Sequence, residues 1–237
     1  MGDCDPMAEA SRGALELLRM LDVELGVLGV GSGRTVLRFL HMAVDAGVEP
    51  GVAVPSSFET GAAVYGLGWT VGDPRVYRGV DAYVDGADEV EPGSGYMVKG
   101  GGGALLGEKI LASRSRLNIF IVGEDKLVGR LGERMPIPVE VEPGFAAMAL
   151  AGLEELGLKP RLRTSQGKRG PVVSDWGGVL VDLHTGPIED PRDLESTLRM
   201  VPGVRETGLF LGLADYIVVG LSGCGYKVLG PYRRGGV

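Results

Sequence analysis

Short runs of aliphatic and β-branched residues alternate with helical patterns through the first half of this 237-residue chain. Four such runs predict buried strands, at residues 27–31, 51–55, 81–85 and 117–123. Helical patterns lie before and between them, at residues 8–22, 35–47, 56–68 and 104–115. Strands separated by helices in this way pair in parallel, so the sequence predicts an α/β fold with a doubly wound, mainly parallel (Rossmann-like) sheet.

The pattern changes after about residue 130. Residues 172–184 predict two strands joined by a Gly-Gly turn, and helices are predicted at 145–157 and 190–200. The apolar run 212–220 then predicts a return to the large sheet. We therefore expect a Rossmann-like catalytic domain of residues 1–129 plus 205–237, and a smaller α+β (ferredoxin-like) domain of residues 130–204.

Charge limits the classes of partner. Lys and Arg number 24 against 31 Asp and Glu, which gives a net charge of −7. A nucleic-acid-binding protein normally has a basic face, so this balance argues against that function. A small anionic substrate stays compatible, because one pocket can be positive on an acidic protein.

The two cysteines, Cys4 and Cys224, lie near opposite ends of the sequence. We expect neither a disulfide framework nor a cysteine-based metal motif from them. No apolar run reaches the roughly 20 residues that span a bilayer, and the first residues lack the features of a signal peptide. These observations predict a cytoplasmic protein with no membrane partner.

The segment 29–35, GVGSGRT, joins the first predicted strand to a helix. Glycines there allow a tight turn, and the N–H groups at a helix start suit a phosphate. Ser32, Arg34 and Thr35 add two hydroxyls and a cation, so we interpret the loop as an anion site. The alternative is an ordinary capped turn, and no nucleotide-binding glycine motif fits the loop.

The stretch 85–109, DGADEVEPGSGYMVKGGGGALLGEK, carries the strongest functional signal. Asp85 ends a predicted strand, and ligands of open α/β sheets bind outside the carboxyl ends of strands. The four glycines from residue 100 lower the stability of regular structure, and close backbone approach to a ligand is a reason to keep them. Glu108 lies one turn into a helix, where a carboxylate stays ionised and suits a general base.

Each of these residues also has an ordinary interpretation. Asp85 and Asp88 could stabilise a turn, Lys99 could be a solvated cation and Glu108 an exposed helix residue. Glu89 and Glu91 are interpreted as surface charge. With only two histidines, a His-rich metal site is excluded, whereas an all-carboxylate magnesium site stays open.

Taken in order, these motifs resemble the ribose-5-phosphate isomerase A family. The matching segments continue along the chain with VGEDKLVGRLG, PIPVEV, VLVDLHTGPIEDP and VPGVRETGLF. The resemblance implies a cofactor-free, metal-free aldose–ketose isomerase that interconverts D-ribose 5-phosphate and D-ribulose 5-phosphate through an enediolate, in the non-oxidative pentose phosphate pathway. It also implies a homodimer or homotetramer.

The resemblance assigns roles by position in this sequence. Glu108 corresponds to the catalytic base, and Asp85, Asp88 and Lys99 correspond to catalytic residues at the reacting end of the sugar. The implied substrate-binding residues are Ser32, Gly33, Arg34, Thr35, Asp85, Gly86, Ala87, Asp88, Lys99, Gly100, Gly101, Gly102 and Lys126. Arg34 departs from the family, which usually has a small hydroxyl residue there.

Two alternatives stay open at this point. One is an amino-sugar phosphate deaminase, which would share the glycine loop and enediol chemistry. The other is a non-catalytic, sugar-phosphate-binding regulatory domain, although residues 1–25 offer no basic recognition helix.

Overall fold

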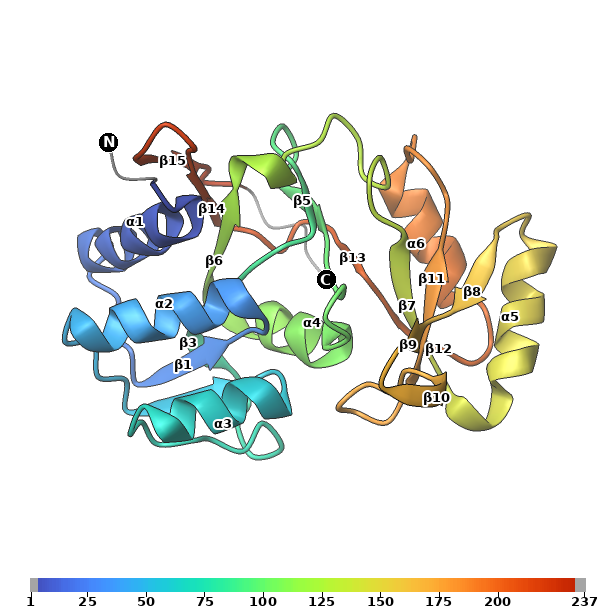
Figure 1. Cartoon of the computed structure of the whole chain (residues 1–237), viewed down its shortest axis with the longest axis horizontal. Coiled ribbons are helices and arrows are strands. Elements are labelled where there is room, and N and C mark those ends of the chain that lie inside the picture. The colour runs from blue at the N-terminus through green and yellow to red at the C-terminus, as the bar shows by residue number, and fades with distance from the viewer. Residues whose placement is uncertain (1–3, 233–237) are drawn as a thin grey trace. The chain divides into compact units, whose positions relative to one another are not determined.

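The computed structural model describes residues 4–232, which divide into two units (Figure 1). Unit 1 comprises the chain up to residue 87, residues 108–127 and the chain from residue 212. Unit 2 comprises residues 88–107 and 128–211. Residues 1–3, at the start of the segment compared with a signal peptide, lie outside the described residues, as does the end of the predicted domain segment 205–237.

Unit 1 is built on a six-stranded sheet of order β15-β14-β6-β3-β1-β2. Its strands are β1 (Val27–Val30), β2 (Val52–Pro55), β3 (Val80–Asp85), β6 (Ser115–Gly123), β14 (Tyr216–Gly220) and β15 (Tyr226–Leu229). All neighbours pair in parallel except β14 and β15, which are antiparallel. The predicted α/β class and mainly parallel sheet are therefore confirmed. The sequence analysis misses β15, because this four-residue edge strand is half-exposed and has no apolar run.

Helices connect these strands. They are α1 (Pro6–Met20), α2 (Arg34–Asp45), α3 (Phe58–Gly66) and α4 (Leu105–Ser113). The first residues of α4 belong to unit 2, and unit 1 resumes at residue 108. All four lie within two residues of the predicted helices. They form where the sequence predicts them because their apolar residues recur at the helical period, which lets one face pack on the sheet.

Helix α1 shows how local sequence and packing agree. The Asp5 side chain accepts a hydrogen bond from the Met7 N–H at 3.0 Å, and Pro6 occupies a first-turn position that needs no N–H partner. The helix packs on α2, β6 and β14 (Figure 1). Its Leu15 and Leu18 are buried in the core of unit 1, each stabilising the fold by about 1.5–3 kcal/mol.

The strand order fixes where a ligand can bind in unit 1. The chain runs from β1 to β2 on one side and then continues to β3 on the other side of β1. Loops after β1 and β3 therefore leave the sheet side by side at its carboxyl edge, since Val30 pairs with Val84 in parallel register. Such a switch point is where open α/β sheets bind ligands.

Unit 2 contains a four-stranded antiparallel sheet of order β12-β7-β11-β8. The chain passes through β7 (Ile137–Val141), α5 (Ala146–Glu155), β8 (Pro160–Leu162), β11 (Val179–Leu183), α6 (Pro191–Arg199) and β12 (Val204–Thr207). This is the βαββαβ order of a ferredoxin-like domain. The exposed hairpin of β9 (Thr164–Ser165) and β10 (Lys168–Pro171) interrupts it between β8 and β11.

A second sheet of unit 2 divides the chain differently from the predicted domain limits. It has the order β13-β5-β4, with β4 (Glu89–Glu91), β5 (Tyr96–Val98) and β13 (Leu209–Phe210). Because β5 pairs with β13, residues 88–107 and 205–211 pack within unit 2 rather than with the large sheet. These strands have only two or three residues each, too short for a periodic signal in the sequence.

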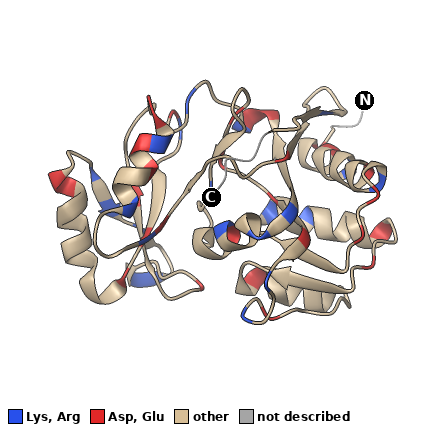
Figure 2. Ribbon diagram, turned by 180° about the vertical axis from the view of Figure 1, so that it is seen from behind, with Lys and Arg blue, Asp and Glu red and all other residues tan. Residues whose placement is uncertain are grey.

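Acidic and basic residues are interspersed on the same helices (Figure 2). In α1, for example, Arg12 pairs with both Glu9 and Glu16. Between residues 4 and 232, no helix combines the length and apolar character needed to cross a membrane.

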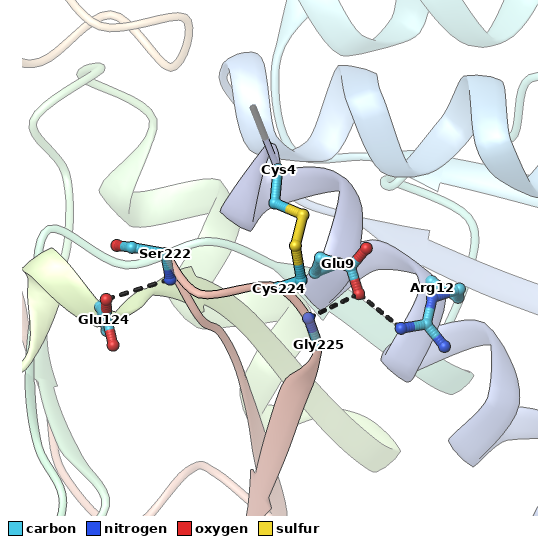
Figure 3. Close-up of a disulfide and its surroundings, with 7 residues drawn as sticks. All are labelled: Cys4, Glu9, Arg12, Glu124, Ser222, Cys224 and Gly225. Atoms are coloured by element: carbon cyan, nitrogen blue, oxygen red, sulfur yellow. Dashed lines mark hydrogen bonds and ion pairs between the residues drawn. A yellow bond between two sulfur atoms is a disulfide. The ribbon is translucent and has the colours of Figure 1, made fainter. Parts of the chain in front are cut away.

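The expectation that the two cysteines would not be linked by a disulfide is wrong. Cys4 and Cys224 form a disulfide, with their Cα atoms 5.3 Å apart (Figure 3). Their 220-residue separation in sequence hides their proximity, because the start of α1 lies beside the turn between β14 and β15. Glu9 strengthens this contact by accepting a hydrogen bond from the Gly225 N–H at 3.1 Å (Figure 3).

We expect the disulfide to stabilise the protein strongly. Closing a loop of this length restricts the unfolded chain, an effect worth about 2–5 kcal/mol. Replacing Cys4 and Cys224 by Ser should therefore lower the thermal midpoint to that of the reduced wild type, measured by calorimetry with and without dithiothreitol. Reductant should not change the double variant. An unchanged midpoint on reduction, or two titratable thiols in the denatured, unreduced protein, would contradict the assignment.

Candidate active site

The Asp85 carboxylate joins two loops at the carboxyl edge of the unit 1 sheet. Asp85 ends β3 and is fully buried. Its Oδ1 accepts hydrogen bonds from the Gly86 N–H at 2.7 Å and from the Ser32 N–H, in the loop after β1, at 3.2 Å. The structure thus brings Ser32 to Asp85 and Gly86, predicted site residues that lie more than 50 positions farther along the sequence.

Hydroxyl groups after β2 support the same loop. Ser56 Oγ and Ser32 Oγ share a hydrogen bond at 2.8 Å, and Thr60 donates from its hydroxyl to the Gly31 carbonyl at 2.7 Å. Ser57 also caps α3, accepting from the Thr60 N–H at 3.3 Å. Capping and loop support therefore coexist in this cluster, which the sequence analysis does not include among the site residues.

Tyr83 is the central residue that the sequence analysis misses. Its side chain is fully buried, and its hydroxyl donates to Asp85 Oδ2. Burial, followed by the charges of Asp85 and Glu108, raises the pKa of Tyr83 well above its ordinary value of 10.0. The phenol consequently stays protonated and donating. An alternating strand pattern cannot reveal this role, because a buried tyrosine in a strand is read as core.

Glu108 lies in the first turn of α4, as predicted, but its environment differs from that of a surface glutamate. Its side chain is almost completely buried, with 4% of its surface exposed. Its charge contributes to the raised pKa of Tyr83, so Glu108 and Asp85 both act on the same phenol. Burying two carboxylates close to one tyrosine costs stability, and such groups are concentrated at functional sites.

The loop after β1 ends at the start of α2. Gly33 has a φ of 90°, a left-handed conformation that favours glycine, and it supplies no side-chain cap to the helix. The N–H groups of the first turn are therefore available for an anion. Arg34 is exposed at this helix start, and the hydroxyl of Thr35 donates to the Met7 sulfur at 3.4 Å.

Unit 2 contains the predicted residues Asp88, Lys99 and the glycine run. Asp88 Oδ2 accepts the Gly101 N–H at 2.7 Å, so the acid is bound to the glycine run. Lys99 is buried, with its ammonium 5.4 Å from the centre of the Phe210 ring. Gly100 and Gly103 have φ values of 97° and 90°, which favour glycine at both positions.

Two further residues predicted to bind the substrate, Lys126 and Ala87, lie outside both hydrogen-bonded groups described above. Lys126 lies in the short helix Glu124–Lys126, where its ammonium pairs with the Asp125 carboxylate at 3.8 Å. Ala87 follows Gly86, ends the first segment of unit 1 and is half-buried. Within residues 4–232, no group of three or more His, Cys, Asp or Glu side chains is arranged to hold a metal ion.

The interpretation of Glu89 as surface charge is wrong. Glu89 is 1% exposed, and its carboxylate accepts N–H groups of the 132–135 loop: Gly132 at 2.6 Å, Arg134 at 2.6 Å and Met135 at 2.8 Å. It organises unit 2 from within. Its neighbours come from a segment over 40 residues away, so local sequence gives no signal of this role.

Comparison with known proteins now identifies the chain's relatives. The family model described as "Ribose 5-phosphate isomerase A (phosphoriboisomerase A)" matches residues 52–223. The chain is also 80% identical, over 98% of both sequences, to ribose-5-phosphate isomerase A of Aeropyrum pernix. The chain belongs to the ribose-5-phosphate isomerase A family.

More distant members agree with this assignment. Ribose-5-phosphate isomerase A of Methanothermobacter thermautotrophicus is 41% identical over 86% of this chain and 89% of its own. The solved ribose 5-phosphate isomerase A of Methanocaldococcus jannaschii superposes with a TM-score of 0.86 at 32% identity, covering 95% of this chain and 98% of that one. A D-ribose-5-phosphate isomerase solved with phospho-erythronic acid gives a TM-score of 0.87 at 33% identity, covering 97% and 100%. The resemblance found in the sequence is thus confirmed, and so is the α/β fold.

Gly31 offers a direct test of the Asp85 arrangement in this family member. A Cβ atom at Gly31 would lie 1.9 Å from Asp85 Cγ, so Gly31→Ala must displace the buried carboxylate. We expect a loss of at least about 1–3 kcal/mol in unfolding free energy, measured by chemical denaturation, together with reduced activity. Gly66→Ala is the matched control, because a Cβ there meets open space at the end of α3. Equal stability of the two variants would contradict the described packing.

Proposed function

We infer that this chain is a ribose-5-phosphate isomerase, which interconverts D-ribose 5-phosphate and D-ribulose 5-phosphate. The observation that carries this conclusion is the pair of buried carboxylates, Asp85 and Glu108, which both act on Tyr83 in a chain of this family. Moving a proton between C2 and C1 of the sugar needs a positioned base and groups that stabilise the developing oxyanion. The family match disfavours both the deaminase and the regulatory-domain alternatives.

Glu108 is the proposed base. It takes the proton from C2 of the open-chain aldose and returns it to C1 of the enediolate, so one carboxylate serves both half-reactions. Its burial supports this role, because few water molecules compete with the substrate for the carboxylate. Its position in the first turn of α4 places it near the positive end of the helix dipole, which stabilises negative charge.

Asp85 is the proposed acid–base partner for the sugar hydroxyls, in ring opening or in proton shuttling between O1 and O2. Tyr83 would act through Asp85: its hydroxyl holds Oδ2, while backbone N–H groups hold Oδ1. This bonding fixes the orientation of the carboxylate. Gly86 and Ala87, which follow Asp85 in the chain, are the proposed backbone contacts of the sugar.

The loop after β1 is the proposed phosphate site. Ser32, Gly33 and Thr35 would contribute hydroxyl and backbone donors at the start of α2, and Arg34 would contribute a charge. Lys126 is proposed as a further substrate-binding cation. A relative is solved with phospho-erythronic acid, a phosphorylated sugar acid, which supports a sugar phosphate as the ligand class.

In unit 2, Lys99 is the proposed electrostatic stabiliser of the enediolate. Asp88 and the backbone of Gly100, Gly101 and Gly102 are the proposed substrate contacts beside it. Burial of the Lys99 ammonium supports the role, since a cation shielded from water interacts more strongly with a developing negative charge.

The cellular setting is also part of the proposal. We propose that the chain works in the cytoplasm as a homodimer or homotetramer, without a membrane or nucleic-acid partner. A disulfide does not rule out this location, since some groups of intracellular proteins are rich in disulfides.

Replacement of the base should stop turnover. We expect Glu108→Gln to lower kcat for ribose 5-phosphate by about 10²–10⁴-fold while leaving the thermal midpoint within a few degrees of wild type. Activity is followed as ribulose 5-phosphate formation in the presence of a chelator. Glu59→Gln is the control, because Glu59 occupies the first turn of α3 but is exposed. Full activity of the Glu108 variant would remove it as the base, and an inactive wild type would refute the function.

Arg34 should affect binding more than chemistry. If its guanidinium holds the phosphate, Arg34→Ala should raise KM about 10-fold, as expected for loss of one charge-assisted hydrogen bond, with kcat nearly unchanged. Arg38→Ala is matched to it: this residue lies one turn farther along α2, is exposed and pairs with Asp5 at 2.8 Å. Equal KM values for the two variants would leave the phosphate to the backbone donors alone.

A further inference from the structure

The guanidinium of Arg163 is bonded to the backbone of the glycine run from within unit 2. Arg163 lies between β8 and β9. Its Nη1 donates to the carbonyl oxygens of Gly100 at 2.9 Å and Gly101 at 3.0 Å. One side chain therefore holds two consecutive peptide groups of a segment that the proposed function assigns to the substrate.

Asp182 on β11 fixes the orientation of this guanidinium. Arg163 Nε donates to the two Asp182 carboxylate oxygens at 3.0 and 3.2 Å, and Nη2 donates to Oδ1. Only 15% of the Arg163 side chain and 19% of the Asp182 side chain are exposed. A shielded, bidentate pair of this kind is more rigid and stronger than a surface ion pair.

The backbone of Arg163 is anchored as well. Its N–H donates to the Leu180 carbonyl at 2.9 Å, and its own carbonyl accepts from the Val172 N–H at 2.8 Å. Both ends of the side chain are consequently fixed to the sheet of unit 2. The guanidinium can therefore hold the glycine run in one position.

A run of four glycines needs contacts of this kind to adopt one conformation. Glycine has little conformational preference of its own, so its backbone geometry must be imposed by outside contacts. Here Arg163 donates to the carbonyls of Gly100 and Gly101. Asp88 accepts the Gly101 N–H, which belongs to the same peptide group as the Gly100 carbonyl. Together these bonds determine the planes of two successive peptide groups.

Peptide geometry then gives the direction of the next donor. In a trans peptide the N–H of one residue points opposite to the carbonyl of the residue before it. Because the Gly101 carbonyl points at Arg163, the Gly102 N–H is directed away from Arg163. Gly102 itself is an exposed residue.

We propose that Arg163, oriented by Asp182, is a positioning residue for the isomerisation: it holds the glycine run so that the Gly102 N–H is pre-aligned as a donor to the enediolate oxygen. This inference rests on the proposed function. A donor aligned before the reaction begins lowers the barrier more than one that must be ordered during it. Arg163 itself need not touch the sugar.

The test compares Arg163→Ala and Arg163→Lys with Arg169→Lys, a change in the exposed β9–β10 hairpin. We expect Arg163→Ala to lower kcat about 10- to 100-fold with KM within about threefold of wild type, a smaller loss than the roughly 10²–10³-fold for removing an oxyanion donor itself. The affinity for phospho-erythronic acid should fall as well. Arg169→Lys should have wild-type values.

Chemical rescue separates positioning from a folding defect. Millimolar guanidinium should restore part of the kcat of Arg163→Ala, whereas urea, its neutral counterpart of the same shape, should not. A folded Arg163→Ala variant with wild-type kcat, or equal responses to guanidinium and urea, would overturn the proposal.

The remaining outcomes are also decisive. If the Ala variant fails to fold, Arg163→Lys decides: one ammonium cannot bind both Asp182 oxygens and both carbonyls, so wild-type kcat in that variant overturns the proposal. Wild-type protein is assayed first. An inactive wild type would refute the proposed function, whereas an active wild type with unaffected Arg163 variants would refute this inference alone.

Discussion

Burial of the Asp85 carboxylate is the constraint on which the rest of unit 1's site depends. A carboxylate removed from water must be hydrogen-bonded, and here the donors are the Tyr83 hydroxyl and the N–H groups of Ser32 and Gly86. These bonds fix the loop after β1 against the loop after β3. They also explain why residue 31 is glycine, since any side chain would occupy the space of the carboxylate. One charge thus determines the geometry of two loops.

The glycine run of unit 2 is held by side chains from outside it. Its residues have no side chains, and glycine has the least conformational preference of any residue type. Its geometry comes from Asp88 on one side and Arg163 on the other. Flexible sequence and rigid surroundings are therefore complementary: the glycines permit a conformation that the neighbouring side chains then select.

Much of this could be predicted from the sequence, for definable reasons. The α/β class, four strands and the helices around them follow from apolar periodicity, which depends only on neighbours along the chain. The candidate residues Asp85 and Glu108 follow from their places at a strand end and a helix start. What the sequence could not give depends on distant contacts: the Cys4–Cys224 disulfide, the role of Tyr83 and the three short strands of the second sheet in unit 2. The burial of Glu89 also depends on distant contacts, with the 132–135 loop, so the sequence indicates only a surface charge.

The disulfide has a consequence for how the chain would respond to a cut in its backbone. The turn between β9 and β10 is exposed, and exposed turns of this kind are preferred sites of proteolytic nicking. A cut there leaves Cys4 on one fragment and Cys224 on the other, so the sulfur bridge still joins both fragments in one covalent molecule. The two pieces of a nicked chain would therefore separate only after denaturation together with reduction.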